Sequence, residues 1–569
     1  MQPTQPLSRR RLLQALSAVS VGSLAFQRTL AAQVAEKGAL TAEMINQAEW
    51  VADLELTDEE RQAVAKSLNG ILESAASIRK LTIDADTPPA QVFRPDFFYA
   101  IADAESPETN STNQGDANKS PTQVQVAWSV DTNAKSTPAD ELAFSSITHQ
   151  ASLLATKQLS SKELTELYLA RLKRFDPVLK CVVTLLEEHA LELAKASDER
   201  RAAGRSRGVL DGIPWVAKDL IAIPPWKTTW GAEPFKDQVR RSIATVASRL
   251  AAEGAVVLAK VTLGALAWGD EWFGGMTRNP WNTEQGSSGS SAGSASSVAA
   301  GLATFALGSE TLGSIVSPCR RCRTSGLRPT FGRISRAGCM PLAWSMDKIG
   351  PIARHVDDLA LVFSALLGTD GKDPSVVERP FHWPVDRKLS ELTIGITNDT
   401  LNSTEQAALD FLTTAGAKTK TLDLKSDIPV EALSVMLGVE ASAVFESPFR
   451  ADRAAKYGLW SSTFRNSQFV TAIHFLQANR LRGQLISETQ RKLSQVDLVL
   501  GGNDLTLTNL TGHPSLIVHC GSETVREKKV PGVIKLTAAA YREDVLLHVG
   551  KAIQTALPPN PNAPTLSES

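Results

Sequence analysis

A serine- and glycine-rich segment interrupted by large apolar residues constrains this chain more than any other feature. The segment spans residues 286–317 and reads GSSGSSAGSASSVAAGLATFALGSETLGSIVS. Plain Ser/Gly sequence is typical of a flexible linker, but a linker has no need of Val298, Leu302, Phe305 and Leu307. Small residues let backbone segments approach closely, and glycine permits turns that other residues resist. The segment therefore favours a packed site where backbone N–H groups converge on a substrate oxygen.

Two serines of this segment and an upstream lysine stand in a recognisable pattern. Lys218 lies in GIPWVAKD (residues 212–219), Ser290 lies in GSSAGS (289–294), and Ser314 follows Ser290 by 24 positions in GSI. This pattern resembles the amidase-signature family, in which a GxPxxxKD stretch precedes a GGSSGGS run and a TGGSIR run. The resemblance covers roughly residues 145–555 and is sharpest over 212–354.

The pattern of apolar residues from residue 144 onward indicates an α/β fold. Short apolar runs at 216–217 and 256–258 alternate with helical patterns that begin at Ser160 and around residue 186. Strands that alternate with helices predict a layered α/β domain. The family resemblance implies more, namely an amidase-signature fold over 144–557, with a large mixed β-sheet core and helices on both faces.

The resemblance also implies a mechanism for hydrolysing a carboxamide C–N bond. Ser314 would attack the carbonyl and form an acyl-enzyme, while Ser290, held on a cis peptide bond, would relay the proton to Lys218. Lys218 must be neutral to act as a base, and burial of an ammonium group lowers its pKa. The backbone N–H groups of Thr311, Leu312, Gly313 and Ser314 would form the oxyanion hole, because such donors stabilise the developing charge.

Several residues around these positions depart from the family pattern. Leu312 replaces the first glycine of TGGS, and its side chain would crowd the loop if the backbone there needed a positive φ. Other departures are Val316 for arginine, Glu310 for aspartate, Ser288 and Ala292 for glycines, and Arg320 and Arg321 in a segment that is usually small and apolar.

Composition narrows the possible partners and cofactors. The 569 residues include 60 basic and 61 acidic side chains, for a formal net charge of −1, which does not indicate a nucleic-acid partner. The five cysteines are too few and too scattered for a disulfide framework. Cys319 and Cys322 form a CxxC, but no second pair of metal ligands follows at the required spacing. We expect no metal and no organic cofactor, and a small-molecule amide as the substrate.

The N-terminus has the pattern of an export signal. Arginines at positions 9–11 precede an apolar stretch from Ala15 to Phe26, and small residues follow at 31–32. The paired arginines resemble a twin-arginine signal, and the apolar stretch is too short to span a bilayer. We therefore expect residues 1–32 to be removed, and the mature protein to be periplasmic without a stable membrane span.

The remaining segments divide by composition. Residues 33–103 are expected to form a small helical segment, with helix over 40–80 and an N-cap at Thr57. Residues 104–143 are rich in Ser, Thr, Asn and Pro and are expected to form a flexible linker. The tail, residues 558–569, is expected to be disordered.

Three functions stay open at this point. The first is an exported amidase. The second is the glutaminase A subunit of a tRNA-dependent amidotransferase, which shares the fold but works in the cytoplasm with partner subunits. The third is a catalytically impaired binding protein, which the departures at Leu312 and Val316 favour. The pocket is expected to draw on residues 395–490, Asp347 and Arg354 are expected to be structural ion-pairing residues, and the tryptophans at 215, 226, 230, 268 and 272 are expected to pack mainly in the core.

Overall fold

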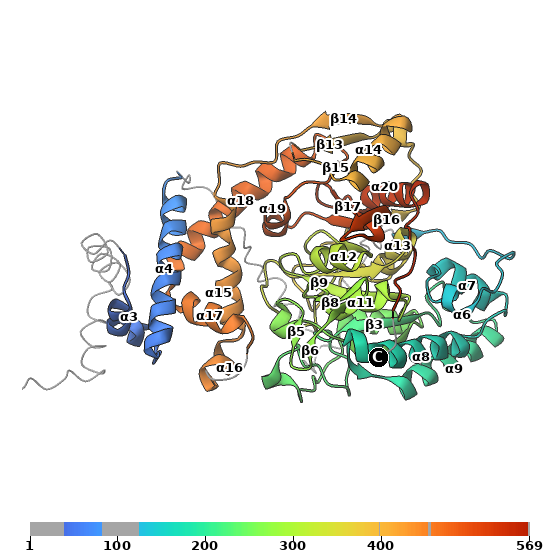
Figure 1. Ribbon diagram of the computed structural model, residues 1–569, viewed down its shortest axis with the longest axis horizontal. Coiled ribbons are helices and arrows are strands. Elements are labelled where there is room, and N and C mark those ends of the chain that lie inside the picture. Colours follow the sequence, from blue (N-terminus) through green and yellow to red (C-terminus); the bar gives the residue numbers. More distant parts are fainter. Residues whose placement is uncertain (1–38, 82–123, 398, 453–456, 567–569) are drawn as a thin grey trace, which may run out of the picture.

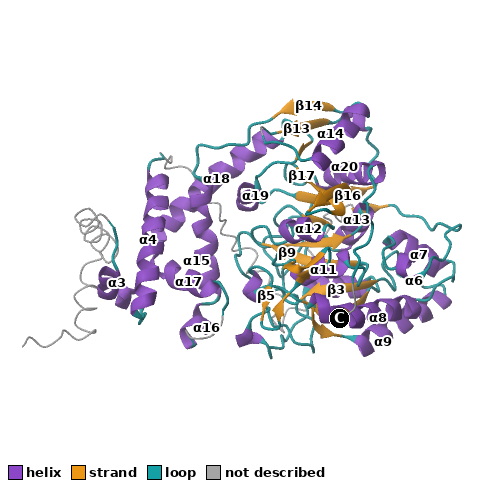
Figure 2. Cartoon of the chain, in the orientation of Figure 1, coloured by secondary structure: helices purple, strands orange, loops and turns teal. Residues whose placement is uncertain are grey.

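A single 11-stranded mixed sheet organises the molecule, with strand order β14-β13-β15-β17-β16-β10-β11-β9-β3-β4-β2. This is a computed structural model, which describes residues 39–81, 124–397, 399–452 and 457–566. Helices pack on both faces of the sheet (Figure 2), so the predicted α/β fold is confirmed. The strands are β2 (Val182–Leu185), β3 (Pro214–Lys218), β4 (Val256–Val261), β9 (Phe305–Glu310), β10 (Ser325–Arg328), β11 (Lys348–Ala353), β13 (Thr393–Ile396), β14 (Lys418–Thr421), β15 (Leu498–Leu500), β16 (Ser515–Val525) and β17 (Lys528–Thr537).

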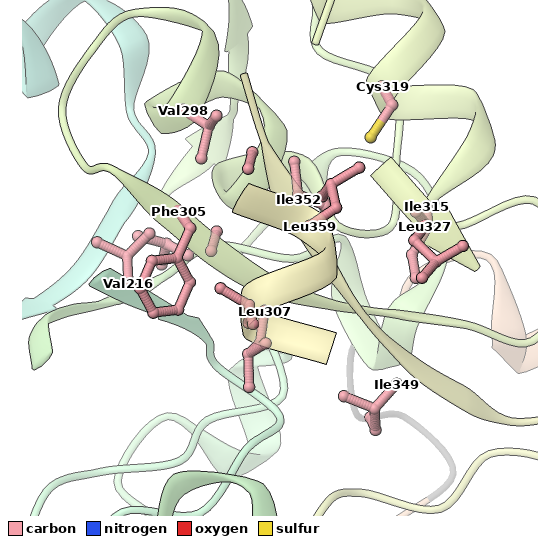
Figure 3. Close-up of a cluster of buried hydrophobic side chains, with 14 of the residues drawn as sticks. Val216, Val298, Phe305, Leu307, Ile315, Cys319, Leu327, Ile349, Ile352 and Leu359 are labelled. Atoms are coloured by element: carbon pink, nitrogen blue, oxygen red, sulfur yellow. The ribbon is translucent and has the colours of Figure 1, made fainter. Parts of the chain in front are cut away.

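The centre of the sheet determines where the site lies. β3 runs parallel to β9, with Trp215 opposite Phe305, and β11 runs antiparallel to β9. Every residue of β3 and β9 is buried, as expected for strands covered on both faces. Figure 3 shows Val216, Leu307 and Ile352, which these three strands contribute to the hydrophobic core. Because β3 and β9 are parallel, their C-terminal ends, at Lys218 and Glu310, leave the sheet at the same edge.

Two of the helices around the sheet, α8 (Ser161–Leu179) and α9 (Glu187–Ala202), begin where the sequence predicts. Ser160 caps α8 with a full capping box, in which its hydroxyl accepts the Glu163 N–H and the Glu163 carboxylate accepts the Ser160 N–H. The predicted helix near 186–203 is also present. The helices of this part are α7 (Ile147–Ala155), α8 (Ser161–Leu179), α9 (Glu187–Ala202), α10 (Thr245–Ala252), α11 (Ala292–Ala299), α12 (Val316–Cys322), α13 (Val356–Ala365), α14 (Ser403–Thr414), α19 (Leu505–Thr511) and α20 (Glu543–Ala556).

A group of helices stands beside the sheet, at the left of Figure 1. It combines α3 (Ala42–Ala48) and α4 (Asp58–Arg79) with α15 (Val435–Val444), α16 (Glu446–Ala451), α17 (Trp460–Asn466) and α18 (Ala472–Leu493). The predicted N-cap at Thr57 is confirmed, again with a capping box. Arg465 forms an ion pair with Glu60 at 2.9 Å, and Asn466 donates to Ser67 Oγ at 2.8 Å. The N-terminal helices thus support α17, whose first residue reaches the site.

Two stretches predicted to lack structure are ordered where the structure describes them. Residues 124–126 form β1, which pairs in parallel with β12 (Phe381–Trp383), and residues 139–142 form α6. Ala134 is buried and Trp128 packs against the core, so this part of the expected linker has apolar anchors that its polar composition obscures. In the tail, Ala563 and Leu566 pack against the same core.

Other predictions concern residues outside the described part of the chain. These are the signal segment, the first half of the expected linker, and the ends of the N-terminal helical segment. Within the described residues, no helix has the length and apolar character needed to cross a membrane.

Candidate active site

Lys218, at the C-terminal end of β3, is the centre of a buried polar cluster. Its side chain is fully buried, and Nζ lies 2.9 Å from Ser290 Oγ, 3.1 Å from Ser291 Oγ and 2.8 Å from Ser309 Oγ. Burial lowers the pKa of Lys218 to about 7, although Asp347 and Glu310 pull it upward. A substantial fraction of this amine is therefore neutral near neutral pH and has a lone pair to accept a proton.

The hydroxyl of Ser291 already makes two hydrogen bonds to the backbone, which distinguishes it from the hydroxyl of Ser290. Ser291 Oγ donates to Ser309 O at 3.0 Å and accepts the Ser309 N–H at 3.1 Å. It can therefore only accept from Lys218. Ser290 has no such second partner among the described residues, so its O–H is free to point at the neutral amine. Ser291 and Ser309 belong to the cluster as well, although no sequence signal separates them from the other serines of the run.

Ser290 lies on a sharply turned loop between β8 (Asn282–Gly286) and α11. The Gly289–Ser290 peptide bond is cis, as the family resemblance implied. Ser288 has φ +62°, a left-handed conformation that favours glycine. Its N–H donates to Asp270 Oδ2 at 2.6 Å. The serine at this family glycine position therefore adopts the glycine conformation, and Asp270 anchors it.

Ser314 lies two residues before the start of α12 and lines a cavity. Its carbonyl oxygen accepts the Ser291 N–H at 3.0 Å, which ties the two serine-bearing loops together. Among the described residues, Ser314 Oγ has no hydrogen-bond partner, and its side chain borders the space that a substrate would occupy. The structure thus brings Lys218 and Ser290 into direct contact and places Ser314 on the adjoining loop.

The loop before Ser314 is held from behind by Glu310. Its Oε2 accepts the N–H groups of Ile315 and Val316 at 2.7 and 2.9 Å. Its Oε1 accepts from Arg328 at 2.9 Å and from Asn509 at 2.7 Å. Burial would raise the pKa of Glu310, but Arg328 and these donors lower it to about 2. Glu310 is therefore ionised and fixes the backbone on the far side of Ser314.

The expected crowding at Leu312 does not occur. In this loop the left-handed residue is Gly313, with φ +85°, whereas Leu312 is not among the residues with positive φ. A Cβ at Gly313 would lie 3.0 Å from both Leu505 Cδ2 and Ser317 Oγ. The Leu312 side chain instead packs against an apolar cluster that includes Ala343, Met346 and Leu510. The one glycine that the backbone needs is therefore retained.

The cavity next to Ser314 has a volume of about 590 Å³. Leu342, Leu437 and Trp460 form apolar walls, and Trp268 stacks edge-on against Trp460 with ring centroids 4.7 Å apart. Residues 434, 437 and 460 come from the stretch 395–490 that was expected to build the pocket. Of the tryptophans expected in the core, Trp215 and Trp230 are buried there, while Trp268 lines the cavity and is 42% exposed. Trp460 was not anticipated, because no motif marks it.

Asp347 and Arg354 are structural, as expected, but neither forms the expected ion pair within the described part of the chain. Asp347 accepts from the Thr311 hydroxyl at 2.6 Å and from the N–H groups of Leu342 and Ala343. Arg354 donates to Asn562 and lies 4.6 Å from the centre of the Phe144 ring. Neither residue has an ion-pair partner among the described residues. Asp347 therefore links the Thr311 loop to the wall at Leu342.

The five cysteines, all within the described part of the chain, have free thiols. Cys319 and Cys322 are both buried with free thiols, and burial raises the pKa of Cys319 well above its usual value. Among the described residues there is no group of His, Cys, Asp and Glu side chains placed to hold a metal ion.

Comparison with known proteins agrees with this geometry. A family model described as Amidase matches residues 163–451. The chain is 34% identical over 473 residues to the glutamyl-tRNA(Gln) amidotransferase A subunit of Azotobacter vinelandii, covering 72% of this chain and 97% of that protein. The native peptide amidase of Stenotrophomonas maltophilia superposes with a TM-score of 0.63 at 28% identity, covering 72% and 96% of the two chains. An amidase family protein of Bacillus anthracis gives a TM-score of 0.66 at 26% identity, covering 75% and 94%. The chain therefore belongs to the Amidase family, the amidase-signature hydrolases that act on amide C–N bonds.

Proposed function

We propose that this protein hydrolyses a small carboxamide through an acyl-enzyme on Ser314, with Ser290 as proton relay and Lys218 as base. The observation that carries the proposal is the hydrogen bond of 2.9 Å between the buried Lys218 Nζ and Ser290 Oγ, beside the cavity that Ser314 lines. A serine hydroxyl needs a base within reach to become a nucleophile. Here the base is reached through one intermediate hydroxyl.

The proton path follows from which hydroxyl groups already have hydrogen-bond partners. As Ser314 Oγ attacks the carbonyl carbon, its proton passes to Ser290 Oγ, and the Ser290 proton passes to the neutral Lys218 amine. The resulting ammonium finds acceptors in Ser291 Oγ at 3.1 Å and Ser309 O at 3.3 Å. The proton then returns through Ser290 to the leaving amine as the C–N bond breaks. Water then attacks the carbonyl carbon of the acyl-enzyme and gives up its proton to Lys218 through Ser290. The proton returns to Ser314 Oγ as the acid leaves.

The oxyanion would be bound by backbone N–H groups of residues 311–314. Glu310 binds the N–H groups of Ile315 and Val316 on the far side, whereas those of 311–314 have no acceptor within the described chain. Buried backbone donors are normally paired, so free donors beside Ser314 support a role in binding a developing charge. Removing one such donor typically costs about 3–4 kcal/mol in the barrier.

Competition between hydroxylamine and water for the acyl group tests whether an acyl-enzyme forms. An anilide and a primary amide of one acid are hydrolysed in the presence of hydroxylamine, and the ratio of hydroxamate to acid is measured. A common acyl-enzyme predicts the same ratio from both substrates, because both reach the same intermediate. Ratios that differ between the two leaving groups would contradict the proposal.

Export through residues 1–32 is part of the proposal, supported by the arginines at 9–11 and the apolar stretch after them. The full chain and an Arg9→Lys/Arg10→Lys variant are expressed with a C-terminal tag in a bacterial host, and the periplasm is separated. Periplasmic protein is expected only for the natural sequence. Equal distribution of both chains would contradict the twin-arginine assignment.

A second candidate is a glutaminase subunit, because the curated relatives are named as amidotransferase subunits. Glutaminase activity that appears only with co-purifying subunits would favour it over a free-standing amidase. The third function, an impaired binding protein, loses one of its supports, since Leu312 does not distort the loop that carries Ser314.

A further inference from the structure

A second cavity opens directly beside the one that Ser314 lines. It has a volume of about 860 Å³ and lies between α12, the β7–β8 hairpin (Arg278–Asn279 and Asn282–Gly286) and the end of the β16–β17 hairpin. Ser288, Ser317 and Arg321 line both cavities. The two cavities therefore adjoin, and Arg321 lies at their junction.

The charges around this second cavity are unbalanced. Arg323 is neutralised by Glu523 at 2.6 Å. The other cations on the walls have exposed side chains and no carboxylate partner among the described residues, and they are Arg320, Arg321, Arg526 and Lys528. Among the described wall residues, the carboxylates left to oppose them are Glu284 and, across the junction, Asp270, which already accepts the Ser288 N–H. Four cations against two carboxylates favour an anion over a cation in this cavity.

The position of Arg321 relative to the nucleophile defines the shape of ligand that fits. α12 begins two residues after Ser314, and Arg321 lies near its C-terminal end. At 1.5 Å of rise per residue, the Cα atoms of Val316 and Arg321 are separated by roughly 7 to 8 Å along the helix axis. The cavity that Ser314 lines has apolar walls at Leu312, Leu437 and Trp460. A ligand that fills both spaces is apolar next to its amide bond and anionic at one end.

We infer that the substrate of this amidase carries an anionic group, and that Arg321 binds it at the junction of the two cavities. That the ligand contains an amide bond rests on the proposed function. That it carries an anionic group rests on the cations around the junction instead. The anionic group is a carboxylate or a similar oxyanion, on the acyl side or on the amine side of the amide. Arg321 is suited to this role because guanidinium groups bind carboxylates in a bidentate manner.

Binding to the Ser314→Ala protein tests this without requiring turnover. The probes are the monoanilides of succinic, adipic and suberic acid, which carry the carboxylate on the acyl side, and 4-acetamidobenzoate, which carries it on the amine side. Each probe is compared by calorimetry with the analogue in which a carboxamide replaces the carboxylate. The same titrations are run with Arg321→Gln added, and with Arg205→Gln added as a control at an exposed arginine that lines neither cavity.

At least one carboxylate is expected to bind more tightly than its carboxamide. Whether that probe carries the carboxylate on the acyl side or on the amine side shows which half of the substrate reaches Arg321. Arg321→Gln is expected to weaken that carboxylate about tenfold, because it removes a charge-assisted contact, while Arg205→Gln keeps the preference. Equal binding of every carboxylate and its carboxamide would overturn the inference, as would an undiminished preference in Arg321→Gln. Failure of catalysis would leave these binding results unaffected, so the two proposals fail separately.

Discussion

Glu310 and Arg328 form a fully buried ion pair, with 2.9 Å between Oε1 and Nη1, directly behind the loop that carries Ser314. Arg328 also donates to His513 O and Ser515 Oγ, both at 2.8 Å. The pair therefore connects the Ser314 loop to β16, on the other side of β10. Because β9 and β16 are not neighbours in the sheet, this contact fixes the loop against a distant part of the core.

Removing the charge of Glu310 is expected to be costly. Glu310→Gln leaves the Arg328 charge buried without a counter-charge, which typically costs about 3–5 kcal/mol. We expect that loss in the free energy of unfolding, measured by urea denaturation, and a loss of activity because the loop is no longer fixed. Glu310→Asp keeps the charge and is the matched control. A Glu310→Gln protein as stable as the Asp variant would contradict this role.

The pKa of Lys218 predicts a specific pH profile. Only the neutral amine acts as base, and burial lowers its pKa to about 7. The value of kcat/KM is therefore expected to fall tenfold per pH unit below about 7 and to level off above it. Lys348, whose pKa burial also lowers to about 7, lies outside the proposed proton path. Lys348→Met serves as the control and should keep the inflection, whereas its disappearance in that variant would assign the inflection to Lys348.

The effect of restoring the family glycine at position 312 distinguishes a competent loop from an impaired one. Leu312 has no positive φ and packs against an apolar cluster. We expect Leu312→Gly to lower the free energy of unfolding by about 1–3 kcal/mol, from lost packing and greater chain entropy. No gain in kcat is expected. A severalfold rise in kcat would instead show that leucine restricts the loop.

Ser288 tests the backbone on the opposite side of the site. Its φ of +62° disfavours any residue with a Cβ. Ser288→Gly is expected to be more stable than Ser288→Ala by about 1 kcal/mol, measured by urea denaturation. Two variants of equal stability would indicate that the loop relaxes to a conformation without a positive φ.

The sequence predicted the parts of the site that depend on local motif. The catalytic candidates could be named because Lys218, Ser290 and Ser314 stand at family spacing, and the helix starts at Thr57 and Ser160 follow from capping chemistry that acts within three residues. The cis bond before Ser290 was expected from the family resemblance as well. These features are short-range or carried by a contiguous pattern.

Features that arise from the tertiary fold were not predictable in this way. Trp460 joins the cavity because α17 packs against the loop at Trp268, far away in sequence. The polar stretch at 124–143 is ordered because a few apolar residues meet the core. Arg320 and Arg321 stood out only as departures from the family pattern, and their meaning depends on a cavity formed together with the β16–β17 hairpin.

Covalent labelling of Ser314 tests the central claim most directly. The purified protein is incubated with a fluorophosphonate probe, and the adduct is located by mass spectrometry of the digested peptides, beside the Ser314→Ala, Ser290→Ala and Lys218→Ala variants. The account predicts an adduct on Ser314 in the natural sequence, none in Ser314→Ala, and strongly slowed labelling in the other two. A folded protein that shows no adduct on Ser314, or labels at the same rate without Lys218, would contradict it.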